Sequence, residues 1–488
     1  MSQQSYLDTT LLSFSDTEHW TIRDAVRGCQ IFGSIGSGKT SGSGQFIAKK
    51  YLKAGFGGLV LCAKPEEAAD WIEYAKSCGK TDDDIIHFCE GSKYRFNPLQ
   101  YETARKSKGG GLTFNLTELF MSVFKMGQRI SGSDSEEQER FWENSLKRLI
   151  NRTIDLIKLS GEEMSVYNMV EIIGTMPTNT DTLLEIREKG KSLDGIKVLN
   201  ESNFCFKCMA YALNNITNPK EERDCNLVYN YFYRDFPLLD DKAQSTIKEM
   251  FLGFAEPFLT GILNDHFAEG TNVTPENTFD GKIIILDFSV KEYLVAGIYA
   301  QCLFKYLWQQ SVERRNIEDD TKPVFLWIDE SQYFINEYDV IFQTTARSSR
   351  ACTVLLSQNI SNYYMQMGGK NVKAKVDSLL GNLGTLIFHN NSDAVTNEWA
   401  SRLIGQEIAH MPQLNISSKL YSTDLQTSET TVASYMPQVQ PKRFTTLRSG
   451  GSDNNYQVDA IVFVTGKSWA DGKNYRKTFF TQNKNSSK

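Results

Sequence analysis

A segment rich in glycine and serine carries the clearest chemical signal in the sequence. Residues 33–40 match the pattern G-x-x-x-x-G-K-[ST] in full. Its glycines let the backbone turn tightly, so that successive N–H groups point at a phosphate, and a following helix would add the partial positive charge of its N-terminus. We expect Lys39 to reach the β- and γ-phosphates of ATP and the Thr40 hydroxyl to ligate Mg²⁺. The predicted phosphate-binding residues are Gly33, Ser34, Ile35, Gly36, Ser37, Gly38, Lys39 and Thr40.

Two adjacent carboxylates follow an apolar run. Val324–Ile328 reads VFLWI, and Asp329 and Glu330 come directly after it. We expect Asp329 to hold Mg²⁺, directly or through water, and Glu330 to polarise the attacking water for hydrolysis. Asp287, near the end of the run KIIILDF, competes for the magnesium role. Because Phe288 follows it in place of a glutamate, we interpret that run as a structural strand of the same sheet.

A third segment is suited to contact the terminal phosphate. The apolar run Thr353–Leu356 leads into a polar segment at 357–359, where Gln358 is the candidate for contacting the γ-phosphate or the attacking water. Arg347 and Arg350 precede this run. In an oligomeric motor such an arginine can stabilise transition-state charge at a neighbouring subunit's nucleotide. We assign that role to Arg347, with Arg350 as the alternative, and a solvated or salt-bridged surface arginine is the competing interpretation for each.

Short apolar runs separated by polar segments predict the strands that position these residues. A strand, the glycine-rich loop, a helix at Thr40–Ala54 and another strand follow in order, which is typical of an α/β fold with a parallel sheet. The predicted strands are Gly57–Leu61, Ile85–Phe88, Lys282–Phe288, Val324–Ile328, Thr353–Leu356, Thr385–Phe388 and Ala460–Thr465.

Residues 112–275 have a different texture, because patterns with a period of 3.6 residues replace strand-like alternation. One apolar stripe consists of Phe141, Leu146, Leu149, Ile150 and Ile154. Lys39 and Asp329 lie 290 residues apart, and the excess over a minimal core amounts to about one extra domain. We therefore predict an ATPase core at 1–111 and 276–488, with an inserted helical domain at 112–275.

Composition limits the classes of partner and compartment. The chain has 488 residues with 53 basic and 59 acidic side chains, a net charge of -6, so no uniformly basic coat covers it and any contact with DNA must be local. The odd number of cysteines, nine, argues for reduced thiols. No apolar run approaches ~18 residues, so we expect no membrane-spanning helix and a cytoplasmic protein, free or peripheral to a membrane complex.

Three further segments have open interpretations. Lys370, Lys373 and Lys375 suit either a loop facing a DNA channel or a solvated helix start. The C-x-x-C pair Cys205 and Cys208 is interpreted as buried thiols, with a metal site as the minor alternative. Residues 419–440 are rich in serine and threonine and predict an exposed or ligand-ordered loop.

With the glycine-rich loop, the acidic pair and the glutamine strand in this order, the chain resembles the FtsK–HerA class of pumping ATPases. Within that class it is most similar to the coupling proteins of type IV secretion and conjugation. Arg347 precedes Gln358 by eleven residues, as in those proteins. The other matching segments are Lys64-Pro65-Glu66, Asn97-Pro98-Leu99, Phe141-Trp142, Asp393 with Thr396, Ser401 and Gly405, and Pro441 with Phe444.

The resemblance implies a RecA-like P-loop ATPase core with an inserted all-α domain, a homo-hexameric ring and DNA passing through a central pore. Secretion, relaxase or nuclease proteins are the partner classes it suggests. The leading hypothesis is an ATP-driven DNA translocase that hydrolyses ATP at subunit interfaces. The alternatives are a nucleotide-gated recruitment module and an ATPase that pumps proteins.

Overall fold

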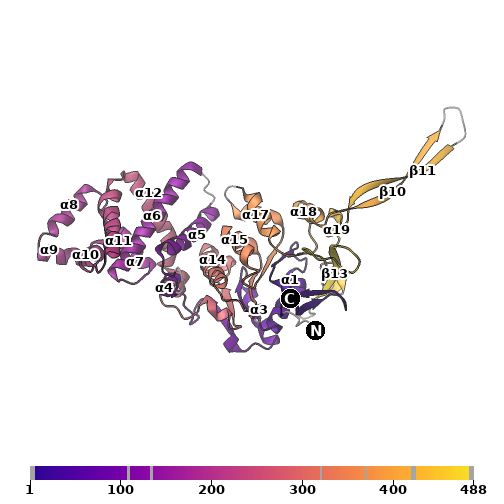
Figure 1. Cartoon of the computed structure of the whole chain (residues 1–488), viewed down its shortest axis with the longest axis horizontal. Coiled ribbons are helices and arrows are strands. Elements are labelled where there is room, and N and C mark those ends of the chain that lie inside the picture. Colours follow the sequence, from indigo (N-terminus) through magenta and orange to yellow (C-terminus); the bar gives the residue numbers. More distant parts are fainter. Residues whose placement is uncertain are drawn as a thin grey trace. The chain divides into compact units, whose positions relative to one another are not determined.

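The structure is a computed structural model that describes residues 6–106, 110–131, 136–318, 321–368, 371–418 and 425–482 (Figure 1). The chain divides into two compact units. The first contains residues 1–58, 71–84 and 315–488, and the second contains residues 59–70 and 85–314.

One nine-stranded sheet has the order β13-β12-β9-β3-β8-β7-β4-β6-β5. β3 lies between β8 and β9 and runs parallel to both, and the pairs β7–β8 and β5–β6 are also parallel. β12 pairs antiparallel with β9 and β13. The strands are β3 (Cys29–Phe32), β4 (Gly57–Leu61), β5 (Ile85–Cys89), β6 (Ile283–Asp287), β7 (Val324–Ile328), β8 (Ala351–Ser357), β9 (Thr385–Phe388), β12 (Gln457–Val464) and β13 (Tyr475–Thr481).

Burial on both faces explains why these strands are continuous apolar runs. Every residue of β3, β4, β7, β8 and β9 is buried, as expected for central strands of a sheet covered by helices. β4 shows how tightly one face is packed. A Cβ on Gly58 would lie 2.4 Å from the Phe325 ring, and that ring stacks on Trp71 with centroids 5.5 Å apart. The α/β prediction is confirmed.

Helices fill the chain between β5 and β6, and the described residues there form no named strand. The main ones are α4 (Pro98–Ala104), α5 (Thr113–Ser131), α6 (Glu136–Ser160), α7 (Val166–Thr175), α8 (Thr180–Lys189), α9 (Leu193–Ser202), α10 (Phe204–Asn214), α11 (Pro219–Asn230) and α12 (Asp241–Ala255). Of the predicted stripe on α6, Leu146 and Ile154 are among the buried members, but Phe141 is 56 % exposed, one turn before the packed face begins. Among the described residues, no helix is both long and apolar enough to cross a membrane.

The serine- and threonine-rich stretch at 419–440 corrects one expectation. Leu425–Pro437 forms β11, which pairs antiparallel with β10 (Gln406–Ser418), and residues 419–424 lie outside the described part. This segment is a strand because its backbone pairs with β10. The serine and threonine content that predicted a loop carries no information about such pairing. The hairpin extends away from the rest of its unit, and Ile408 and Tyr435 face each other across it, both exposed (Figure 1).

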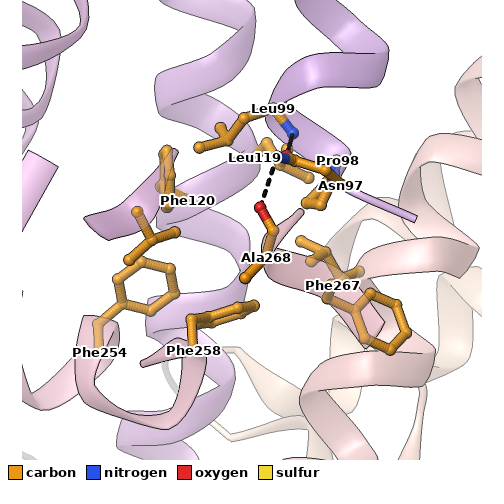
Figure 2. A pocket seen from close by; sticks show the side chains of 11 residues that line it. Asn97, Pro98, Leu99, Leu119, Phe120, Phe254, Phe258, Phe267 and Ala268 are labelled. Atoms are coloured by element: carbon orange, nitrogen blue, oxygen red, sulfur yellow. Dashed lines mark hydrogen bonds between the residues drawn. The ribbon is translucent and has the colours of Figure 1, made fainter. Parts of the chain in front are cut away.

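Asn97 shows why the Asn-Pro-Leu segment has these residues. Its side-chain oxygen accepts hydrogen bonds from the N–H groups of Leu99 and Gln100, each at 3.0 Å, and so caps α4, while Pro98 occupies the first turn, where no N–H is needed. Its amide donates to the Ala268 carbonyl at 2.7 Å (Figure 2). The small apolar cavity beside it has room for about one water molecule. Its lining includes Leu99, Phe120, Phe254, Phe258 and Phe267.

We expect Asn97→Ala to lower the free energy of unfolding by about 2 kcal/mol, because it removes a helix cap and leaves the partly buried Ala268 carbonyl without its donor. Asn179 caps α8 through one hydrogen bond, at an exposed position. Asn179→Ala is therefore a matched control that should cost about 1 kcal/mol. Urea unfolding followed by circular dichroism measures both, and equal losses would contradict the role given to the Ala268 contact.

Candidate nucleotide-binding site

The glycine-rich loop leaves the carboxyl end of β3 and turns into a helix. Gly36 and Gly38 have φ of +72° and +80°, a region that favours glycine. A Cβ on Gly38 would also lie 2.6 Å from a methyl group of Val458. Among the described residues, the N–H groups of Gly36, Gly38 and Lys39 donate to no backbone carbonyl in a turn or loop. They are therefore available to an anion. The predicted helix begins as a π-helical turn, Thr40–Gly44, and continues as α2 (Gln45–Lys53).

Asp329 and Glu330 follow β7 on the same edge of the sheet. Phe32 at the end of β3 pairs with Ser357 of β8, and Ile328 at the end of β7 pairs with Leu355. This register places the ends of three parallel strands together. The Thr40 hydroxyl donates to an Asp329 carboxylate oxygen at 2.6 Å.

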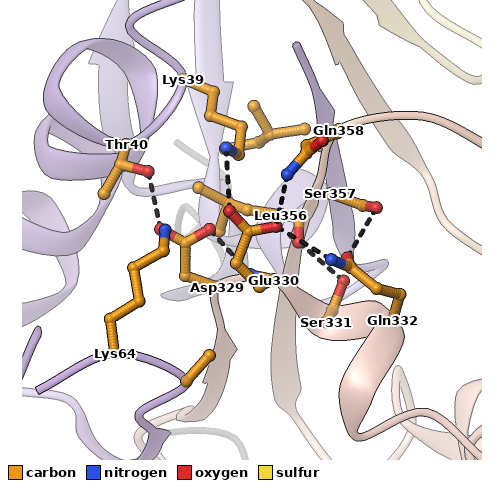
Figure 3. A network of polar contacts seen from close by, with 12 residues as sticks. Lys39, Thr40, Lys64, Asp329, Glu330, Ser331, Gln332, Leu356, Ser357 and Gln358 are labelled. Carbon is orange, nitrogen blue, oxygen red and sulfur yellow. Dashed lines mark hydrogen bonds and ion pairs between the residues drawn. The ribbon is translucent and has the colours of Figure 1, made fainter. Parts of the chain in front are cut away.

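Glu330 is the centre of the polar network (Figure 3). One carboxylate oxygen lies 3.5 Å from Lys39 Nζ, and the other accepts hydrogen bonds from Gln332 at 2.9 Å and from Gln358 at 3.3 Å. The Lys39 and Glu330 side chains are only 8 % and 7 % exposed. Glu330 has a φ of +45°, a left-handed conformation that costs a non-glycine residue energy and is typical of functional sites.

The structure thus brings Lys39, Thr40, Asp329, Glu330 and Gln358 into one cluster. Their chemistry fits a nucleotide with a divalent cation, because a cation and free N–H groups suit phosphate and a hydroxyl beside a carboxylate suits Mg²⁺. The Ser37 hydroxyl of the loop is buried and has no partner among the described residues, which leaves it available to a bound group.

Gln332 is a member of the network that the sequence prediction missed. It joins Glu330 to β8, because its side-chain oxygen accepts a hydrogen bond from the Ser357 hydroxyl at 2.9 Å. The adjacent Ser331 donates to the Leu356 carbonyl at 2.8 Å. Together these bonds fix the turn that follows β7. An amide two residues after the acidic pair was the available signal.

The two candidate arginines have different environments. Arg350 is buried, has a φ of +50° and donates to the Thr321 carbonyl at 2.6 Å, so its guanidinium holds the chain that leads into β7. Arg347 is exposed. The structure brings neither of them into the Glu330 cluster by a described contact.

The other candidate residues have local partners. Asp287 lies 2.8 Å from His87 Nε2 on the neighbouring strand. Lys375 pairs with Glu337 at 2.6 Å and Lys373 with Asp377, while Lys370 lies outside the described residues. Cys205 and Cys208 are buried on α10, and burial raises the pKa of both thiols. Among the described residues, no group of three or more His, Cys, Asp or Glu side chains could hold a metal ion.

His389 is a second residue that the sequence prediction left without a role. It follows β9 and is completely buried, with Nδ1 2.8 Å from the Asp459 carbonyl and Nε2 2.6 Å from the Ser43 hydroxyl. Burial, with the Lys39 charge adding to it, lowers the pKa of His389 to about 4. The ring is therefore neutral at physiological pH.

This pKa predicts a pH dependence of stability. The free energy of unfolding should fall as the pH drops from about 6.5 to about 4, because in that window the unfolded chain binds a proton at His389 and the folded chain does not. The full effect approaches about 3 kcal/mol. In His389→Gln this component is absent, so urea unfolding across the window should show a flatter profile than the wild type. Parallel profiles would exclude His389 as the source.

Comparison with known proteins identifies the fold. The bacterial conjugative coupling protein TrwBdeltaN70 in its unbound form is 12 % identical, with 99 % of this chain and 91 % of that chain covered and a TM-score of 0.58. TrwB with the non-hydrolysable ATP analogue ADPNP is 13 % identical (99 % and 90 % covered, TM-score 0.55), and TrwB with ADP and Mg²⁺ is 11 % identical (99 % and 90 %, TM-score 0.56). No protein-family model and no curated protein sequence matches the chain. The predicted class, a RecA-like P-loop core with an inserted all-α domain, is confirmed.

Proposed function

We propose that this chain is an ATP-driven DNA translocase of the coupling-protein type, which hydrolyses ATP at the subunit interfaces of a homo-hexameric ring. The observation that carries the proposal is the buried cluster that joins Lys39 to Glu330 and Thr40 to Asp329. TrwB, which shares the fold, is described as a conjugative coupling protein and has been solved with an ATP analogue and with ADP and Mg²⁺, which supports ATP and Mg²⁺ as the ligands here.

The residues of the cluster divide the work of hydrolysis. Lys39 and the free N–H groups of the loop bind the phosphates, and Thr40 and Asp329 hold Mg²⁺, which supplies charge neutralisation when bound. When Lys39 binds the phosphates, its ion pair with Glu330 is broken. The Glu330 carboxylate then accepts a proton from the attacking water, while Gln332 keeps it oriented and Gln358 contacts the γ-phosphate.

Glu330→Gln should lower kcat for ATP hydrolysis by about 10²–10⁴-fold without raising KM, because it removes the base and spares Lys39 the loss of its ion pair when it binds the phosphates. Glu398→Gln makes the same change at an exposed position of the same unit and serves as the matched control. The assay is steady-state hydrolysis with and without single- and double-stranded DNA. Strong stimulation by DNA that disappears in Glu330→Gln is the expected result.

A protein-directed function is the second candidate, as a recruitment module or a protein pump. The net charge of -6 favours it, as does the pairing of Lys373 and Lys375 with carboxylates of their own unit. Hydrolysis that is indifferent to both forms of DNA would select this function over translocation. A wild type that neither binds nor hydrolyses ATP would contradict both.

Arg347 is proposed to act on the nucleotide of the neighbouring subunit, because it is exposed whereas Arg350 holds a carbonyl of its own chain. Arg347→Ala should lower kcat by about 10³-fold. Mixing Arg347→Ala with Lys39→Ala subunits should restore activity at about a quarter of the interfaces in a ring, where an intact loop meets an intact arginine. No recovery on mixing would contradict action between subunits, and Arg402→Ala, at another exposed position, is the control.

A further inference from the structure

The turn that follows the glycine-rich loop has an uncommon backbone geometry. Thr40–Gly44 is a π-helical turn, in which the Gly44 N–H donates to the Lys39 carbonyl at 2.9 Å. A Cβ on Gly44 would lie 2.9 Å from that same carbonyl oxygen, so the turn requires glycine there. Single π turns are rare and occur frequently at functional sites. Contacts from other segments of the chain are therefore expected to favour this turn over an ordinary α-helical turn.

His389 supplies the first of these contacts. The Asp459 carbonyl can only accept, so Nδ1 of His389 carries the proton and Nε2 is an acceptor. The Ser43 hydroxyl must then donate to Nε2, across 2.6 Å. Both side chains are completely buried, so water cannot replace this bond. His389 thereby links the turn to the ends of β9 and β12.

Gln482, directly after β13, supplies the second contact. Its amide nitrogen donates to the Ser41 hydroxyl at 2.7 Å, and its oxygen accepts from the Gly451 N–H at 2.9 Å. Val458 of β12 also lies against the turn, because a Cβ on Gly42 would be 3.2 Å from its side chain. Two serines of one turn are thus held by side chains that follow two different strands of the sheet.

We propose that His389 and Gln482 are positioning residues for the nucleotide, which act through Ser43 and Ser41 to hold the turn that aims the phosphate-binding N–H groups. The inference rests on the proposed function, because it concerns the same ATP site. Lys39 lies at the junction, since its carbonyl accepts the bond that closes the turn. Without the two contacts the turn can relax to an ordinary α-helix, and the loop loses its preset geometry for phosphate.

Paired substitutions separate positioning from general stability. His389→Asn keeps a donor for the Asp459 carbonyl but does not reach Ser43, whereas His389→Gln places an oxygen acceptor near the position of Nε2. Ser43→Ala removes the same bond from the other side. Gln482→Ala tests the second contact at a partly exposed position, where a folding defect is least expected, and Gln440→Ala at an exposed position is its matched control.

The measurement is the Kd for a fluorescent ATP analogue with Mg²⁺, together with kcat and KM for ATP, on the full chain. We expect His389→Asn, Ser43→Ala and Gln482→Ala to raise Kd and KM by about tenfold with kcat at saturation little changed. His389→Gln and Gln440→Ala should stay within about threefold of the wild type. The double variant His389→Asn/Ser43→Ala should bind no more weakly than the worse single variant, because both substitutions remove the same Ser43–His389 hydrogen bond.

One outcome would overturn this inference and leave the proposed function standing. In it, the wild type binds the analogue, and Gln482→Ala and the His389 and Ser43 variants bind it with unchanged affinity. Equal losses in His389→Asn and His389→Gln, or additive losses in the double variant, would also overturn it, because the Ser43 bond would then not be the cause. A wild type that does not bind the analogue would overturn the proposed function itself, and this inference with it.

Discussion

The buried ion pair between Lys39 and Glu330 is the interaction on which the site depends. Two charges removed from water cost several kcal/mol unless other groups satisfy them, and deletion of one partner leaves an uncompensated charge worth about 3–5 kcal/mol. Here Gln332 and Gln358 supply the remaining hydrogen bonds to the carboxylate. The glycine-rich loop and the acidic pair are therefore one electrostatic unit, which forms only when the strands that carry them end at matching levels of the sheet.

That requirement explains which parts of the fold could be predicted from the sequence. Strands such as β4, β7 and β9 are buried on both faces, so each is a continuous apolar run that stands out in the sequence. Only Tyr475 and Phe480 of β13 are buried, and residues 431–435 of β11 are exposed, so neither strand has that signal. Both depend on pairing with a partner strand, which the local sequence does not encode.

The residues of the site likewise divide into those that the sequence predicts and those that it does not. Lys39, Thr40, Asp329, Glu330 and Gln358 lie in motifs whose order and spacing predict their proximity, and the structure brings them together. Gln332 was missed because the only sequence signal is an amide two residues after the acidic pair, and its role follows from a turn in which Glu330 adopts a left-handed conformation. The position of His389 depends on pairing between β9 and β12, and its role depends on a tautomer that only the Asp459 carbonyl fixes. Such contacts between distant segments have no signature in one sequence.

The place of the helical insertion follows from the same constraint. β5 and β6 are adjacent, parallel and last in the sheet order, whereas the strands that carry the site, β3, β7 and β8, are next to one another at its middle. The entropy of closing a longer connection grows only slowly with its length, so about one domain can be inserted between the edge strand β5 and its neighbour β6 at small cost. Changes in the helical insertion therefore need not alter the strand register that the buried ion pair requires.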